Sequence, residues 1–140
     1  MVILHVLFPE QKDFVDAARH IFDAIGISRW EEHESENYPG GQYFKGSGMN
    51  LNATIALEDD FGYDDYQYWA ILNKETDSRI DLESEVENVA VKLLRTGLGV
   101  ARGIENDPAA DADHIVRVIY ELDSDGRVRT RKEKMPITRS

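Results

Sequence analysis

The amino-acid sequence predicts an α+β domain: a mainly antiparallel sheet of about five to seven strands with two helices packed on it, in the order β-α-β-β-β-β-α-β-β. Residues 49–57 alternate between apolar and polar side chains, which is typical of a strand with one buried face. Residues 82–104 carry apolar side chains at helical spacing. A chain of 140 residues suits one domain, which we expect over residues 1–135 with a free tail at 136–140.

The first part of the chain predicts a strand, a helix and a charged strand. The apolar run Val2–Leu7 has the composition of a buried strand. Residues 10–25 have helical spacing, and Pro9 suits the first turn because the missing N–H has no partner there. Gly26 suits the residue that ends the helix. Residues 27–37 then predict a half-solvated strand rich in glutamate.

The middle of the chain predicts short strands separated by turns. Residues 42–45 form a short strand between a Pro-Gly-Gly turn at 38–41 and a glycine-rich turn at 46–48. The alternating strand at 49–57 and an aromatic strand at 66–72 are expected to form a hairpin whose wide tip is acidic.

The last part of the chain predicts a long helix and a final hairpin. The helical spacing of residues 82–104 extends over about six turns, with Asp81 as the N-cap. Residues 114–122 are apolar on both faces, which predicts a central strand. The turn Asp123–Gly126 then returns the chain as a basic edge strand at 127–134.

The composition excludes several classes of site. The chain has no cysteine, so disulfides, thiolate nucleophiles and cysteine-ligated zinc are excluded. The four histidines are far apart, and the acidic loop does not have calcium-loop spacing. The glycines of 97–103 have GxGxxxG spacing inside the predicted helix, unlike a dinucleotide-binding turn. We therefore expect no catalytic residue, no metal site and no cofactor.

The charge of the chain is uneven. The net charge is −11, and residues 31–65 alone carry −8, with nine acidic residues and a single base, Lys45. Negative potential repels nucleic acid and anionic lipid, and it attracts basic proteins. The apolar N-terminal run is too short to span a membrane and lacks the features of a secretion signal. We expect a cytoplasmic protein that binds neither nucleic acid nor membrane.

The acidic segments and the tyrosines beside them are the candidate partner-binding residues. Tyrosine is a preferred anchor in protein interfaces, and acids would steer a basic partner toward the surface. The alternative is that the acids form solvated loops and the aromatic residues cover the sheet. The C-terminal basic cluster is expected either to neutralise these acids within the chain or across a dimer, or to hold an anion. The candidates are Glu31, Glu32, Glu34, Glu36, Glu58, Asp59, Asp60, Tyr63, Asp64, Asp65 and Tyr66.

In length, acidity and lack of catalytic motifs, the chain resembles the small immunity proteins of bacterial toxin and contact-dependent inhibition systems. That resemblance rests on the whole chain's composition and charge layout. It implies an acidic protein-binding domain that neutralises a basic partner, such as a toxin nuclease. The alternative is a small non-catalytic regulatory or ligand-binding domain of unassigned role, with a homodimer left open.

Overall fold

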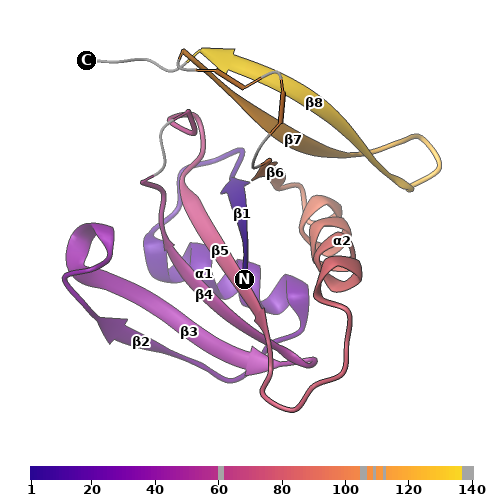
Figure 1. The fold of residues 1–140 in the computed structure, drawn as a ribbon. Helices are drawn as coiled ribbons and strands as arrows, with labels where there is room; N and C mark the ends of the chain where they lie inside the picture. Colours follow the sequence, from indigo (N-terminus) through magenta and orange to yellow (C-terminus); the bar gives the residue numbers. More distant parts are fainter. Residues whose placement is uncertain (60–61, 105–106, 109, 112, 137–140) are drawn as a thin grey trace.

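The computed structural model describes residues 1–59, 62–104, 107–108, 110–111 and 113–136. In this part of the chain an eight-stranded sheet has the order β2-β3-β4-β5-β1-β6-β7-β8, and every neighbouring pair is antiparallel (Figure 1). The strands are β1 (Val2–Leu7), β2 (Trp30–Glu34), β3 (Gln42–Gly48), β4 (Leu51–Leu57), β5 (Tyr68–Lys74), β6 (Gly99–Gly103), β7 (His114–Leu122) and β8 (Val128–Pro136). The helices are α1 (Phe14–Ile25) and α2 (Leu82–Arg95), and η1 (Pro39–Gly41) is a short 3-10 turn.

The predicted α+β class is confirmed, and the described sheet has one strand more than predicted. The extra strand is β6, because the helix predicted over residues 82–104 ends at Arg95. Gly97 has a φ of +88°, and the N–H of Leu98 donates to the carbonyl of Leu93, as in a helix-ending Schellman motif. The apolar residues after Gly97 therefore continue as a strand between β1 and β7.

The glycines expected to form a turn at 46–48 instead lie inside β3. A Cβ at Gly46 would lie 2.8 Å from the Cβ of Trp30, so this glycine allows β2 to approach β3 closely. The hairpin turn follows at Met49 and Asn50, whose φ angles are 55° and 65°. Two positive φ angles in a two-residue loop are those of a type I′ turn.

Some of the other elements begin and end where the sequence predicted, and others do not. α1 begins at Phe14, later than predicted, so Pro9 lies before the helix. Gly26 ends α1 in the left-handed conformation, and the Asp81 side chain accepts a hydrogen bond from the backbone of Glu83, as predicted. β8 is an edge strand as predicted, and it includes Pro136; the rest of the predicted tail, 137–140, lies outside the described residues.

The main hydrophobic core lies between the helices and one face of the sheet. α1 lies behind β1, β4 and β5 in the view of Figure 1, while α2 packs against β5, β6 and β7. The buried faces of the strands and helices meet here. Phe22 of α1 and Leu93 of α2 are fully buried. The largest buried side chains are Phe22, Phe44, Leu4, Ile21, Ile25, Ile27, Ile55, Leu72 and Leu93.

A second, smaller core lies on the opposite face of the sheet. Residues 62–67, which precede β5, fold over β1, β6 and β7 and place Tyr63 and Tyr66 against Ala101 and Ile119. The loop is anchored by Gln67, whose side chain accepts a hydrogen bond from the backbone of Phe8. β7 lies second from the sheet edge rather than at the centre, and its two apolar faces are explained by α2 on one side and this loop on the other.

Candidate functional site

The exposed acids of β2 lie on the edge of the sheet. Side chains alternate between the faces of a strand, so Glu31 and His33 share one face while Glu32 and Glu34 share the other. All three glutamates are exposed. Glu31 contacts His33, and Glu32 accepts a hydrogen bond from Gln42. Within the described part of the chain, none of the three forms an ion pair with a lysine or an arginine, although Glu31 lies directly opposite Lys45 on β3.

An aromatic stack lies on the face of the sheet that carries Glu31 and His33, whereas Glu32 and Glu34 lie on the other face of the edge strand. His33 lies over Tyr43 on the neighbouring strand, with ring centroids 5.2 Å apart, and Tyr38 stacks on the same tyrosine at 4.4 Å. These three side chains are each partly exposed. Together with Glu31, Glu32 and Glu34 they form what we call the β2 surface. The stack was not predicted from the sequence, because the pairing of His33 with Tyr43 depends on strand register.

One acid of the segment between β4 and β5, Glu58, makes its contacts inside the protein. The Glu58 carboxylate binds Nδ1 of His5 and the indole N–H of Trp69, and the Glu58 side chain is 6% exposed. The His5 ring is stacked on Tyr63 with centroids 3.5 Å apart. Asp59 follows directly and is exposed. Glu58 therefore acts within the fold, where it holds a buried imidazole beneath the loop.

Arg117 on β7 holds the other side of this loop. Its side chain is 4% exposed, and it donates to both carboxylate oxygens of Asp65, at 2.9 and 3.0 Å, and to the backbone carbonyl of Gly62. It also binds Glu133 of β8. These bonds hold the pKa of Asp65 and the pKa of Glu133 below their usual values. The loop is thereby tied to the β7–β8 hairpin.

The structure separates the candidate residues into two groups. Glu31, Glu32 and Glu34 lie on β2 with Glu36 exposed just after it, at the opposite end of the strand order from β8. The residues of the loop lie over β1, β6 and β7; Tyr63 and Tyr66 are 4% and 9% exposed. Asp64 is exposed, and Asp60 lies outside the described residues.

The basic residues of β8 are neutralised within the chain. Arg131 binds Glu121 at 2.6 Å and Glu133 at 3.0 Å, and Arg129 binds Asp123. Lys132 and Lys134 reach the carboxylates of Asp107 and Asp111, respectively. These partners lie within residues 107–133, so the β8 contacts that the structure describes do not neutralise the acidic region 31–65.

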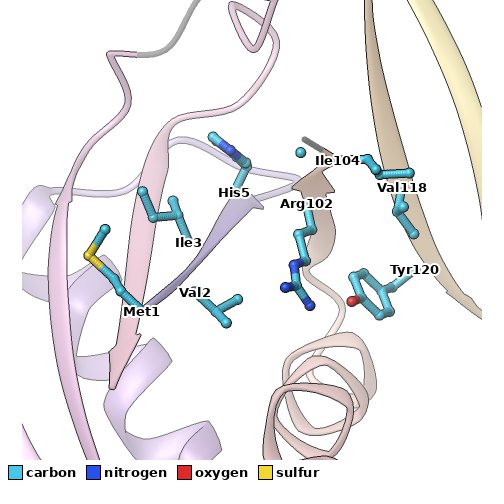
Figure 2. Close-up of a pocket in the computed structure, with 9 residues that line it drawn as sticks. Met1, Val2, Ile3, His5, Arg102, Ile104, Val118 and Tyr120 are labelled. Atoms are coloured by element: carbon cyan, nitrogen blue, oxygen red, sulfur yellow. The ribbon is translucent and has the colours of Figure 1, made fainter. Parts of the chain in front are cut away.

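A cavity of about 530 Å³ opens where β1 and β6 separate. Its lining is contributed by the first residues of β1, the end of β6 and the middle of β7. Figure 2 shows the Arg102 side chain extending past Val2 toward the Tyr120 ring, while the His5 ring points the other way, toward the loop face. The lining residues are Met1, Val2, Ile3, His5, Arg102, Gly103, Ile104, Val118 and Tyr120.

Three searches found nothing: for metal sites and for membrane-spanning helices among the described residues, and for similar proteins. Among the described residues, no group of three or more histidine, aspartate or glutamate side chains is placed to hold a metal ion. No helix in the described part of the chain is long and apolar enough to cross a membrane. Comparison with known proteins found no matching protein-family model, curated protein or solved structure.

Proposed function

We propose that the chain is an acidic protein-binding domain that holds a basic partner on the β2 surface. One observation carries this proposal: Glu31, Glu32 and Glu34 are exposed on an edge strand, and none forms an ion pair with a lysine or arginine in the described part of the chain. The basic residues of β8, in contrast, have acidic partners. Exposed carboxylates on this edge strand, with Lys45 opposite Glu31 as the one facing base on β3, favour a cationic partner by complementarity and by long-range steering.

The aromatic stack supplies the anchors that the acids need. Exposed ion pairs contribute little affinity because water and salt compete with them. Tyrosines that become buried in an interface contribute far more, and Tyr38 and Tyr43 are partly exposed on the face of the edge that carries Glu31. The proposed interface therefore combines steering by acids with desolvation of the two tyrosines. Tyr63 and Tyr66 serve the second core, so we place the anchors on the β2 surface.

We propose a toxin nuclease as the basic partner, which makes the domain an immunity protein. A nuclease surface is cationic because it must bind phosphates. An acidic domain that occupies this surface would exclude the nucleic acid. The size and charge of the chain support this assignment.

The test is binding to the protein encoded by the neighbouring reading frame, and co-expression rescue of its toxicity. We compare a triple variant on the β2 surface, Glu31→Lys, Glu32→Lys and Glu34→Lys, with a control of equal charge change at the exposed Glu10, Asp23 and Glu87. The β2 variant is expected to weaken binding about a hundredfold, or ~3 kcal/mol. The control is expected to lose far less, mainly in association rate at low salt.

Two outcomes would contradict the proposal. Equal loss in both triple variants would mean that overall charge drives binding and that the β2 surface has no special role. Full binding without rescue would remove the immunity assignment and leave a protein-binding domain.

A second candidate function is a small regulatory or ligand-binding domain. The specific observation that favours it is the cavity between β1 and β6, whose volume falls within the range of small-molecule sites, about 300–1,000 Å³. The cavity is separate from the β2 surface, since β3, β4 and β5 lie between β2 and β1 in the sheet. The two functions are therefore testable independently.

A further inference from the structure

The cavity exists because the sheet opens at its centre. β1 pairs with β6 through three residues only, His5–Leu7 against Gly99–Ala101. Beyond this point β1 continues beside β5 as far as Val2, while β6 continues beside β7 as far as Gly103. The two central strands therefore diverge, and their ends line the opening shown in Figure 2.

The lining combines aliphatic side chains with the cationic side chain of Arg102. Val2, Ile3, Ile104 and Val118 contribute aliphatic side chains. The Arg102 guanidinium extends across the opening toward Tyr120 (Figure 2). Sites for small molecules commonly combine an apolar wall with a few placed polar groups that fix the ligand's orientation. Within the described lining no carboxylate side chain is present, so Arg102 is the side chain there that could bind an anionic ligand.

The partner that Arg102 now has is a carboxylate from outside the lining. Glu83, in the first turn of α2, accepts hydrogen bonds from Nη1 and Nη2 of Arg102 at 2.7 and 2.9 Å. The Glu83 side chain is 63% exposed, whereas that of Arg102 is 29% exposed. Because Glu83 remains largely hydrated in this pair, a carboxylate in the cavity can compete with it for the same two N–H groups of Arg102.

The geometry of that pair indicates which anion fits. A single planar guanidinium that donates two parallel hydrogen bonds matches the two oxygens of a carboxylate. A ligand carboxylate within the cavity would be less hydrated than Glu83. Its electrostatic attraction to Arg102 would therefore be less screened by water. An apolar body attached to it would cover the aliphatic wall formed by Val2, Ile104 and Val118.

We infer that this cavity binds a small carboxylic acid with an apolar body, whose carboxylate binds Arg102 in competition with Glu83 and whose body packs between β1 and β7. The inference rests on the second candidate function, the ligand-binding domain. It does not involve the β2 surface. Glu83 then serves as a replaceable counter-ion that keeps Arg102 in position when the ligand is absent.

The test uses 4-phenylbutanoate as the probe and 4-phenylbutanamide, its neutral analogue, as the matched control ligand. Binding to the full chain is followed by shifts of backbone amide signals in NMR titrations. The carboxylate is expected to shift the signals of Gly103, Ile104 and Val118 and to bind at least about tenfold more tightly than the amide.

Two substitutions with opposite expected effects make the test specific. Arg102→Gln is expected to weaken 4-phenylbutanoate binding at least about tenfold, because the cation is lost. Glu83→Gln is expected to strengthen it several-fold, because the competing charge is gone. Arg95→Gln removes an exposed arginine at the other end of α2 and is expected to leave the affinity unchanged. A purely structural ion pair would make the first two variants behave alike.

Several results would overturn the inference. These are equal affinity for the carboxylate and the amide, no shift at the three named amides, or weaker binding in Glu83→Gln. If Arg102→Gln does not fold, the Glu83→Gln result and the comparison of the two ligands still decide the matter. Failure here would leave the β2 surface proposal standing, since binding of the protein partner by Arg102→Gln or Glu83→Gln is expected to equal that of the unmodified chain.

Discussion

β2 and β8 are the two edge strands of the sheet, and both carry charged side chains along most of their length. In β8 the charged residues are paired with acids of the same region, as in the contacts of Arg131 with Glu121 and Glu133. In β2 the glutamates lie within reach of a histidine and an amide, and none forms an ion pair with a lysine or arginine in the described part of the chain.

This difference separates two uses of charge on a sheet edge. Charged side chains on an edge strand prevent pairing with other sheets, and either strand serves that purpose. Only a charge that is not neutralised internally also creates a lasting attraction for an oppositely charged protein. The basic residues of β8 are therefore paired with acids, while the β2 surface carries exposed glutamates that form no ion pair with a lysine or arginine in the described part of the chain.

The largest expected effect comes from removing the carboxylates that compensate Arg117. The double variant Asp65→Asn and Glu133→Gln leaves a cation whose side chain is 4% exposed without an acidic partner. We expect a loss of ~3–5 kcal/mol in the free energy of unfolding, because a buried charge is then uncompensated. Urea denaturation measures the loss. The control, Glu121→Gln, removes the acid of an exposed pair and is expected to cost less than about 1 kcal/mol.

An equal, small loss in the free energy of unfolding for both variants would contradict the idea that the ion pairs of Arg117 hold the loop and the β7–β8 hairpin together. It would mean that water reaches Arg117 and compensates it. Residues 62–67 and β8 would then be held mainly by the apolar contacts of Tyr63 and Tyr66.

Because of the same two carboxylates, we expect the free energy of unfolding to depend on pH, with an effect of intermediate size. Hydrogen bonds from Arg117 lower the pKa of Asp65 and of Glu133 in the folded state. A lowered folded-state pKa gives stability that is present above the unfolded-state pKa, about 4, and is lost as the pH falls through the folded-state value. Asn and Gln resemble the protonated acids, so the stability gap between the native chain and the double variant is expected to shrink below about pH 4.

Urea midpoints of both proteins, measured from neutral pH into the acid range, test this. The other carboxylates are common to both chains, so their titration cancels in the difference. A gap that stays constant, or widens as the pH falls, would show that the lowered pKa values do not contribute to stability.

The sequence predicted the features that depend on neighbouring residues. The Asp81 cap, the left-handed Gly26 and the turn at Asp123–Gly126 each use chemistry confined to a few residues, and each is found in the structure. β6 was missed because its apolar residues continue the spacing of α2. The positive φ of Gly97 ends the helix, and a single glycine does not reveal its φ in a sequence.

The candidate site was only partly predictable, for a different reason. Asp65 and Arg117 are separated by 52 residues, and nothing local to either one shows that they meet. The loop was therefore predicted to be an exposed tip that binds a partner or is solvated, although the two-sided apolar pattern of β7 required a cover on each face. The exposed acids of β2 were found from charge alone. Their aromatic neighbours Tyr38 and Tyr43 needed the register of β2 and β3.

The smallest expected effect on stability comes from the hairpin turns. The β7–β8 and β3–β4 turns differ in which residue they place at a positive φ angle. The β7–β8 turn places glycine, Gly126, at its positive φ of 79°. The β3–β4 turn places Met49 at a φ of 55°, with its side chain 57% exposed beside Gly26. A methionine in this conformation is strained by about 1–2 kcal/mol. Such strain is characteristically retained where a side chain serves a function.

We therefore expect Met49→Asn to raise the free energy of unfolding by ~0.5–1 kcal/mol, since asparagine tolerates the left-handed conformation. Met49→Ala is the matched control: it removes the exposed side chain but keeps a Cβ at the same φ, so it is expected to bring little gain. Equal gains in urea denaturation would mean that side-chain exposure, and not backbone strain, is the cause. If Met49 also extends the β2 surface, Met49→Asn will be more stable yet bind the basic partner less tightly. A variant that is more stable and binds equally well would confine the partner to β2 and its tyrosines.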